Sequence, residues 1–446
     1  MKVISTIGPA SEDLSNLKKI LDHSSIVRLN GSHSSLNWHK KVLDKIKKLD
    51  PYKTILFDIP GVKPRTLNQS NLEINKNDMV LFFYKKFKFE KKVHKIIEIS
   101  NPLPKFKSKI KTFSLDDGKY TFKLIEYNSE FIVGKSLNKF TLKTKKGLNI
   151  PDGIYDNKKQ TLKYLKFLNQ IQDFKIDAVG LSYIQDPKTI SKIRKKYKKL
   201  IIVSKIENLE GLNNAQMICE NSDAIMIDRG DLSAEIGLEN MYEAIIKISN
   251  HSKKFHVPLI MATDNLTSMI NHDQPTKSEI VSIEHAKSIG TDCIMLSEET
   301  AISNNYLNTL KWLKKAFFKP SIKKNFKDVS ILNINKYLNQ MQVVLVSKKG
   351  YVFEKAIKKF DENLIIYFTN DIFSFHRSVF YKNFKSIYLS KLIREKFDQS
   401  YVFKIIKKYK SFVFENSNMV LLIHALFPRK KIRANSISIL NKRDFL

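Results

Sequence analysis

Short apolar runs alternate along the chain with stretches in which apolar residues recur every three or four positions. The runs are typical of buried strands, and the stretches, such as "LENMYEAIIKISNHSKKF" (238–255), are typical of amphipathic helices. Eight such runs occur, at 2–8, 25–30, 54–58, 176–183, 200–207, 224–231, 257–263 and 293–299. Eight strand–helix units form a closed parallel barrel, so the pattern predicts an α/β fold of the (β/α)8 TIM-barrel type.

Two segments depart from this pattern. Residues 67–150 are rich in Lys, Phe, Thr and Ile, with turn signals at "NKND" and "DDGK", and predict a small β-barrel lid domain inserted into the barrel. The barrel domain would then comprise 1–66 and 151–330. From 331 to 446, the runs "VVLVS", "NLIIYFT", "SIYLS", "SFVFE" and "MVLLIHAL" predict a C-terminal α/β domain with a mixed sheet.

Polar side chains stand where the eight barrel runs end. They are Arg28, Asn30, Asp58, Ser182, Lys205, Glu207, Arg229, Asp231, Thr263, Ser297 and Glu299. In a parallel barrel the C-terminal ends of all strands meet on one face, where enzymes with this fold place their sites. We therefore expect these groups to converge there.

The formal net charge of +34 raises the question of nucleic-acid binding. The chain has 69 Lys against 9 Arg, and the lysines are spread along it without an RNA- or DNA-reading motif. Compositional drift explains this pattern better, although attraction of small anions remains a consequence. A basic scaffold or nucleic-acid binder stays open as an alternative of a different class.

The composition also bears on the compartment. Cys219 and Cys293 are the only cysteines, which fits a reducing cytosol without a disulfide framework. No apolar run is long enough to span a membrane, and the first residues do not resemble a signal peptide. We expect a cytoplasmic protein of 446 residues with several domains.

Several strand ends carry candidate chemistry. Lys205 and Glu207 are two residues apart, so on a strand both face the same side. Glu207 and Asp231, at neighbouring strand ends, offer the hard oxygen ligands that Mg²⁺ takes. Taken singly, Lys205–Glu207 also reads as a surface ion pair, and Asp231 as a helix cap.

Other candidates are weaker when taken alone. Arg28 could fork onto a phosphate, or belong to an interior polar network with Asn30 and Ser32. Thr263 alone is more typical of a structural strand end. The histidines, including His33, lack metal spacing, and no P-loop or dinucleotide motif is present.

Six motifs together carry a family resemblance. They are "STIGPAS" (5–11), "RLNGSHS" (28–34), "SKIENLEG" (204–211), "DRGDL" (228–232), "MATDN" (261–265) and "MLSEETA" (295–301). Their order and spacing resemble pyruvate kinase over essentially the whole chain. The resemblance implies Mg²⁺-dependent transfer of a phosphoryl group from phosphoenolpyruvate to ADP, giving pyruvate and ATP in the last step of glycolysis.

The resemblance also implies roles for residues that match its motifs. Lys205 would stabilise charge on the transferring phosphoryl group and on the enolate, and Arg28 would hold the phosphate. Glu207 and Asp231 would hold Mg²⁺. The backbone of Gly230 and Asp231 would bind the substrate carboxylate, and Thr263 would lie beside the reacting carbon. The nucleotide would be bound by Arg65, Lys146, Asn30 and His33. By the same analogy, a homotetramer is expected.

The stretch "LFDIPGVKPRT" (56–66) departs from the usual family pattern in a paired way. Ile59 stands where most members have Thr, and Lys63 stands where they have Glu. In most members Asn30, Ser32, Asp58 and the residue after it would surround K⁺, whereas a potassium-independent branch carries Lys and an aliphatic residue here. The resemblance implies that Lys63 replaces K⁺ in a pocket of Asn30, Ser32 and Asp58.

Three acidic departures raise another alternative. Asp228, Asp264 and Glu298 replace uncharged family residues near an anion site, where each would repel phosphate unless paired or turned away. A pyruvate-kinase-like protein with lost or altered activity on another 2-keto acid enolate therefore stays open. The effector loops differ too, at "SKKGYV" (347–352) and "HALFPRKKIRAN" (424–435), so we expect no activation by fructose-1,6-bisphosphate.

Overall fold

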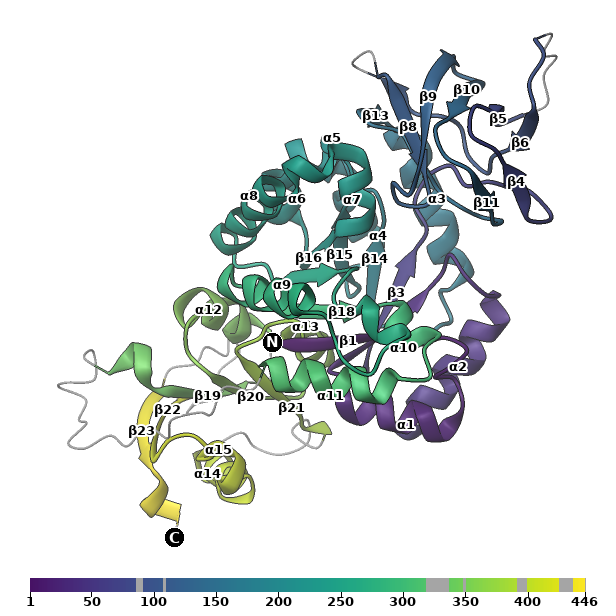
Figure 1. Cartoon of the computed structure of the whole chain (residues 1–446). Helices are drawn as coiled ribbons and strands as arrows, with labels where there is room; N and C mark the ends of the chain where they lie inside the picture. Colours follow the sequence, from purple (N-terminus) through teal and green to yellow (C-terminus); the bar gives the residue numbers. More distant parts are fainter. Residues whose placement is uncertain are drawn as a thin grey trace.

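The computed structural model describes residues 1–85, 91–106, 110–317, 337–347, 350–390, 399–424 and 436–445. Its centre is a closed barrel in the order β1-β18-β17-β16-β15-β14-β3-β2, and all its strand pairs are parallel (Figure 1). The strands are β1 (Lys2–Thr6), β2 (Ile26–Asn30), β3 (Thr54–Ile59), β14 (Ala178–Leu181), β15 (Ile201–Ile206), β16 (Ala224–Asp228), β17 (Leu259–Ala262) and β18 (Cys293–Leu296). The TIM-barrel prediction is confirmed.

Helices cover the outside of the barrel (Figure 1). They are α1 (Leu14–His23), α2 (Leu36–Leu49), α3 (Asn157–Gln170), α4 (Pro187–Lys196), α5 (Leu209–Asn213), α6 (Ala215–Asn221), α7 (Arg229–Ile236), α8 (Met241–Lys254), α9 (Lys277–Ser288), α10 (Glu298–Ala301) and α11 (Tyr306–Phe317). Short 3-10 turns occur at η1 (Leu238–Asn240) and η2 (Thr267–Ile270). Several helices begin at a side-chain cap, such as Asp13 before α1 and the capping box of Thr276 and Glu279 at α9.

Two of the predicted barrel runs extend past their strand into the following helix. The run 224–231 ends as a strand at Asp228, and Arg229 begins α7. The run 293–299 ends at Leu296, and Glu298 begins α10. Asp231 and Glu299 therefore lie in the first turns of these helices. The sequence pattern did not separate strand from helix, because the apolar run continues from the strand into the buried side of the next helix.

Strand residues alternate between two cores. Ile55 and Phe57 pack outward against the helices, whereas Leu56 packs inward with other barrel residues. Val203 and Met226 also belong to the inner cluster. This period of two means that the polar residue two positions beyond each inward residue also faces the barrel interior.

The inserted β region follows β3 (Figure 1). A sheet in the order β12-β8-β9-β10-β5-β6 is joined by the pairs β11-β4 and β13-β7. The strands are β4 (Leu72–Ile74), β5 (Met79–Phe83), β6 (Lys95–Glu98), β7 (Lys105–Phe106), β8 (Thr112–Leu115), β9 (Tyr120–Tyr127), β10 (Phe131–Ser136), β11 (Phe140–Leu142), β12 (Leu148–Asn149) and β13 (Gly153–Ile154). Phe82, Phe113 and Phe122 lie in its core. The predicted small β insertion is confirmed.

A five-stranded C-terminal sheet runs in the order β21-β20-β19-β22-β23, parallel except for the antiparallel edge pair β22-β23. Its strands are β19 (Gln342–Ser347), β20 (Ile365–Thr369), β21 (Phe384–Tyr388), β22 (Met419–His424) and β23 (Ser436–Asn441). Its helices are α12 (Tyr351–Lys359), α13 (Ile372–Ser378), α14 (Gln399–Lys408) and α15 (Lys410–Val413), with 3-10 turns η4 (Leu338–Gln340) and η6 (Lys442–Phe445). The mixed sheet is confirmed.

One predicted strand of this part is wrong. The run "SFVFE" (411–415) overlaps α15, and Val413 packs against the sheet from that helix. A run of three apolar residues does not distinguish a strand from a buried helical turn. Of the two segments that stand in place of the family's effector loops, 348–349 of the first and 425–435 of the second lie outside the described residues.

The C-terminal sheet joins the end of the barrel opposite the strand C-termini. His376 of α13 contacts Thr54 and Asp177, which stand at the start of β3 and just before β14. Phe380 packs inside the barrel with Ile4 and Leu56, and its carbonyl accepts a hydrogen bond from Cys293. Both cysteines are buried free thiols. Within the described ranges, no helix is long and apolar enough to cross a membrane.

Candidate active site

The alternation of barrel residues brings a polar layer together above the apolar inner cluster. Asp58 follows Leu56 by two positions, Lys205 follows Val203, and Asp228 follows Met226, so all three face the barrel interior. Arg28 reaches the same layer from β2 and is buried. The sequence therefore places one guanidinium, one ammonium and two carboxylates at the C-terminal mouth of the barrel.

Lys205 is the centre of this layer. Its Nζ lies 2.8 Å from Glu207 Oε1, 3.2 Å from Asp228 Oδ2 and 3.3 Å from Asp58 Oδ2. Burial lowers the pKa of Lys205, but the three carboxylates outweigh burial and raise that pKa well above its ordinary value. Lys205 therefore carries a firm positive charge in a place closed to water.

Arg28 and Asp58 form the second ion pair of the layer. Arg28 Nε donates to Asp58 Oδ2 at 3.0 Å and Nη2 donates to the same oxygen at 2.6 Å. Burial raises the pKa of Asp58, but the charges of Lys205 and Arg28 outweigh burial and lower it. Arg28 Nη1 also donates to Thr6 Oγ1 at 3.1 Å, which fixes the guanidinium beside Lys205.

Lys63 forms a separate group with Asp231 and Asp117. Its ammonium pairs with the Asp231 carboxylate and lies 3.2 Å from Asp117 Oδ1. The Lys63 side chain is only 5% exposed. Burial lowers the pKa of Lys63, but the two carboxylates outweigh burial and raise it. Burial raises the pKa of Asp231, and Lys63 then lowers it far below its ordinary value. Tyr183 Oη donates to Asp231 Oδ1 at 3.1 Å.

This arrangement differs from the monovalent-cation pocket that the resemblance implies. Among the described residues, Asp58 forms its ion pairs with Arg28 and Lys205 rather than with Lys63. Asn30 Oδ1 accepts a hydrogen bond from Ser32 N at 3.1 Å, so these two residues form a local turn. The loop after β3, which contains two prolines and a glycine, brings Lys63 across the mouth to α7. The pattern of residues along a single strand does not indicate this contact.

Glu207 and Asp231 lie together as the sequence predicts. Ligand oxygens of Glu207, Asp228 and Asp231 fall within 4.8 Å of one another. Burial raises the pKa of Glu207 to about 8; Lys205 opposes this effect, and the neighbouring Asp231 and Asp228 add to it. In the described part of the chain, Glu207 Oε1 is buried without a hydrogen bond, and it lies 2.8 Å from the Lys205 ammonium. Three hard oxygen donors with one such oxygen fit a divalent cation.

Thr263 and Gly230 also meet at the mouth. Gly230 N donates to Thr263 Oγ1 at 3.0 Å, and Thr263 Oγ1 donates to Ala262 O at 2.7 Å. Thr263 and Asp264 have φ values of +58° and +49°. A left-handed conformation is costly for β-branched Thr, and such strain is concentrated at functional sites.

Arg229 does not join the mouth, although its motif pointed there. Its Nη1 donates to Ser282 Oγ at 2.7 Å, and its other nitrogens donate to the loop after β17, including the Thr263 carbonyl. Arg229 is the first residue of α7, so its side chain turns outward from the barrel. It holds the strained Thr263 backbone in place.

The expected nucleotide residues gather beside the inserted β region. Arg65 pairs with Gly147 as a β-bridge and donates from Nη1 to Lys145 O at 3.2 Å. Lys146 Nζ lies 2.7 Å from Asp116 Oδ1. Burial lowers the pKa of His33, and Arg65 lowers it further, so this imidazole is neutral near pH 7. The influence of Arg65 and Lys146 on His33 indicates that these side chains lie near one another.

The three acidic departures fall in different places. Asp264 and Glu298 are exposed, so both carboxylates are turned to solvent. Asp228 is 7% exposed and paired with Lys205. Only Asp228, among these three, belongs to the site.

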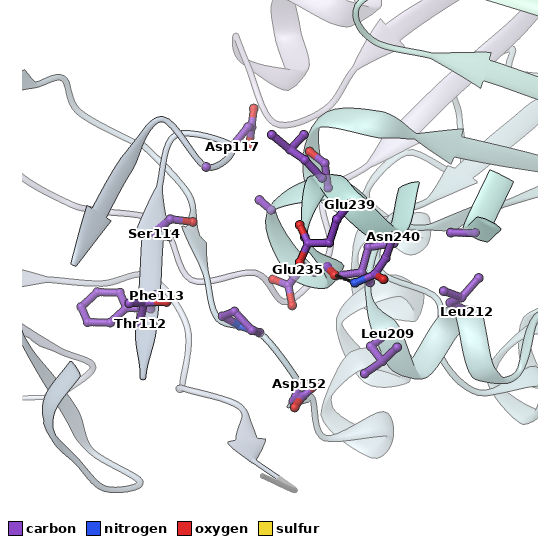
Figure 2. Close-up of a pocket in the computed structure, with 18 of the residues that line it drawn as sticks. Thr112, Phe113, Ser114, Asp117, Asp152, Leu209, Leu212, Glu235, Glu239 and Asn240 are labelled. Carbon is purple, nitrogen blue, oxygen red and sulfur yellow. Dashed lines mark hydrogen bonds between the residues drawn. The ribbon is translucent and has the colours of Figure 1, made fainter. Parts of the chain in front are cut away.

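A cleft of about 800 Å³ opens between the inserted β region and the barrel (Figure 2). Its charged lining consists of Asp117, Asp152, Glu235, Glu239, Glu243 and Lys247. Five carboxylates against one ammonium do not suit a phosphate-bearing substrate. The cationic groups for such substrates lie instead at the barrel mouth and around Arg65.

Sequence reasoning missed two groups at the mouth. Asp117 was read only as part of a turn signal, and Tyr183 as the end of an apolar run. Asp117 and Tyr183 both have left-handed backbones, with φ values of +56° and +62°. The second acidic residue of the turn signal "DDGK" is the available indication, because a turn does not require two carboxylates.

Comparisons with known proteins agree with this geometry. A family model described as "Pyruvate kinase, barrel domain" matches residues 1–309. A pyruvate kinase of Thermococcus litoralis is 30% identical over 328 residues, covering 70% of this chain and 68% of the relative. Those of Thermotoga maritima (30% over 336 residues; 70% and 69% covered) and Borreliella burgdorferi (26% over 379 residues; 78% and 78% covered) are also similar. The chain therefore belongs to the pyruvate kinase family of phosphotransferases.

Proposed function

We propose that this enzyme transfers the phosphoryl group of phosphoenolpyruvate to ADP in a Mg²⁺-dependent reaction and releases pyruvate and ATP, as the last step of glycolysis. The observation that carries the proposal is the buried Lys205 ammonium, held among Glu207, Asp228 and Asp58 at the mouth of a pyruvate-kinase barrel. Phosphoryl transfer depends mainly on alignment and on neutralising charge, which a buried ammonium and guanidinium supply.

Lys205 and Arg28 are proposed to receive the substrate phosphate. Both side chains are buried and fixed by Asp58, so they need little reorganisation when charge moves. Lys205 also stabilises the enolate oxygen that forms when the phosphoryl group leaves. Arg28 provides two parallel N–H donors, which Lys cannot replace.

Gly230, Asp231 and Thr263 are proposed to position the organic part of the substrate. The Gly230 N–H stands at the first turn of α7, where backbone donors favour a carboxylate. Its partner without substrate is the Thr263 hydroxyl, so binding would exchange one acceptor for another. The released hydroxyl of Thr263 would then take part in delivering the proton to the enolate carbon.

Glu207 and Asp231 are proposed to hold Mg²⁺, with substrate oxygens and water as further ligands. When bound, Mg²⁺ would neutralise charge on the phosphoryl oxygens. Arg65 and Lys146, with His33 and Asn30 nearby, are proposed to hold ADP. Support for this placement is their position on the border between the barrel and the inserted β region.

Independence from K⁺ is also proposed. Although Lys63 does not pair with Asp58, its ammonium is buried and fixed in the same mouth by Asp231 and Asp117. A tethered cation supplies locally the positive charge that a bound K⁺ would bring. Ile59, whose side chain has no oxygen to offer a cation, is consistent with this view.

Three further expectations remain proposals. They are the division into a barrel domain (1–66 and 151–330), a lid domain (67–150) and a C-terminal domain (331–446), a homotetramer, and a cytoplasmic location. The alternative of lost or altered activity rested on three acidic residues. Two of them face solvent and the third is paired with Lys205, so this alternative has little left to support it.

The test is ³¹P NMR of phosphoenolpyruvate and ADP incubated with the enzyme. We expect the phosphoenolpyruvate signal to decline while the three ATP signals grow, and we expect EDTA to stop the conversion. Persistence of both substrates with Mg²⁺ present would contradict the proposal.

A further inference from the structure

Asp228 occupies the usual place of a helix cap but does not act as one. It immediately precedes α7, where an Asp side chain commonly accepts a hydrogen bond from the first-turn backbone. Here the Asp228 side chain makes no capping hydrogen bond. Its carboxylate enters the barrel mouth instead, because Asp228 continues the inward-facing positions of β16 after Met226.

The carboxylate is placed close to two proposed metal ligands. Oxygens of Asp228, Glu207 and Asp231 lie within 4.8 Å of one another, although the three residues come from the ends of two strands and the start of one helix. Glu207 is buried, and its Oε1 has no hydrogen bond among the described residues besides its ion pair with Lys205. This group of oxygens is compact enough to share one cation.

The local charge balance calls for a dication. The two ion-paired groups contain three cations, Lys205, Arg28 and Lys63, and five carboxylates, Asp58, Glu207, Asp228, Asp231 and Asp117. Within these two groups the carboxylates outnumber the cations by two. A bound Mg²⁺ or Mn²⁺ would offset this excess of carboxylates.

We infer that Asp228 is a third protein ligand of the divalent cation, beside Glu207 and Asp231. The inference rests on the proposed function for the reaction that the cation serves, but the binding site is defined by this chain alone. A third carboxylate tightens cation binding and replaces one coordinated water, because affinity for hard cations rises with the number of charged ligands.

The test uses Mn²⁺ as the probe and the whole enzyme without substrates. Asp228→Asn and Asp228→Ala are compared with Asp264→Asn, which removes the same charge from an exposed residue beside the site. We expect the Mn²⁺ dissociation constant, measured by electron paramagnetic resonance, to rise at least tenfold in both Asp228 variants. In Asp264→Asn it should change less than twofold.

A second measurement distinguishes direct coordination of the cation by Asp228 from an electrostatic effect of the Asp228 charge that acts through Lys205. In ²H₂O, electron spin-echo spectroscopy counts the waters on bound Mn²⁺. Asp228→Ala should add one coordinated water. An unchanged count would overturn the inference, even if affinity fell, because it would show an effect of charge only. Thermal unfolding and circular dichroism verify that the variants are folded.

The outcomes also separate this inference from the proposed function. Wild-type turnover without Asp228-dependent Mn²⁺ binding would remove the inference and leave the function intact. Asp228-dependent Mn²⁺ binding without turnover of phosphoenolpyruvate and ADP would do the reverse.

Discussion

The ammonium of Lys63 pairs with the carboxylate of Asp231, so a residue just after β3 reaches across the barrel mouth to the first turn of α7. Asp117 of the inserted β region touches the same ammonium. Lys63 therefore connects the loop after β3, the first turn of α7 and the inserted β region. It also fixes the position of Asp231, a proposed Mg²⁺ ligand. Its loss affects metal binding, substrate placement and the position of the insertion together.

Turnover should not depend on K⁺. Because the Lys63 ammonium is covalently held, wild-type turnover should change less than twofold when tetramethylammonium replaces K⁺ at constant ionic strength. The double variant Ile59→Thr/Lys63→Glu restores an oxygen-rich surrounding and should gain K⁺ activation. A tenfold or larger rise of wild-type turnover with K⁺ would refute this account of Lys63.

Replacing Arg65 should weaken nucleotide binding selectively. Arg65→Met removes a forked cation that Lys cannot replace, so KM for ADP should rise about tenfold. KM for phosphoenolpyruvate should stay within twofold, because that substrate is assigned to Lys205 and Arg28. Lys143→Met, an exposed lysine of the same region, is the matched control and should leave both values unchanged. Equal rises for both substrates would argue against the assignment.

Lys163 should give stability an unusual dependence on alkaline pH. Its Nζ donates to Gly61 O at 2.6 Å and to Asn101 Oδ1 at 3.1 Å, and burial, with Arg65 adding to it, lowers its pKa to about 8. Between pH 8 and the ordinary value of 10.5, the unfolded chain holds a proton that the folded chain lacks. The contribution of Lys163 to the free energy of unfolding therefore rises with pH in this window and is constant below it.

Urea unfolding of the wild type and of Lys163→Met at pH 7, 8 and 9.5 measures this effect. Relative to the variant, the wild type should gain stability above pH 8, by at most about 1.4 kcal/mol per pH unit. A constant difference between the two proteins across these pH values would show that Lys163 titrates normally.

Phe380 should stabilise the junction between the barrel and the C-terminal sheet. It is fully buried inside the barrel with Ile4 and Leu56 although it comes from the segment after α13. Phe380→Ala should lower the free energy of unfolding by about 3–5 kcal/mol, as expected for a truncated buried aromatic ring. Ile372→Ala, at a side chain 40% exposed, should cost much less. KM values should not change at permissive temperature, since the junction is at the opposite end of the barrel from the site.

The apolar pattern predicted the barrel because each inward residue of a strand recurs at every second position. The same periodicity predicts that Asp58, Lys205 and Asp228 face the barrel interior. It does not tell where a strand gives way to a helix, so Asp231 was assigned to a strand although it lies in α7. Likewise, "SFVFE" was too short to reveal that it enters a helical turn.

The contacts of Lys63 and Arg229 could not be predicted from the sequence. Lys63 lies in the loop after β3, and Arg229 is the first residue of α7. The direction of each long side chain depends on tertiary neighbours: Asp231 and Asp117 for Lys63, and Ser282 and the Thr263 carbonyl for Arg229. The sign of the effect of Asp228 was open for the same reason. A carboxylate near an anion site repels phosphate when it is free, and it supports the site when an ammonium lies 3.2 Å away.

The most direct measurement is the rate of pyruvate formation from phosphoenolpyruvate, ADP and Mg²⁺ by the wild type and by Lys205→Met, with Lys198→Met as the exposed control. Loss of the buried ammonium removes a charge aimed at the reacting oxygens, so we expect turnover to fall by a factor of about 100 to 1,000 or more. Lys198→Met should match the wild type. Turnover of Lys205→Met within threefold of the wild type, in a folded protein, would contradict the central role of Lys205.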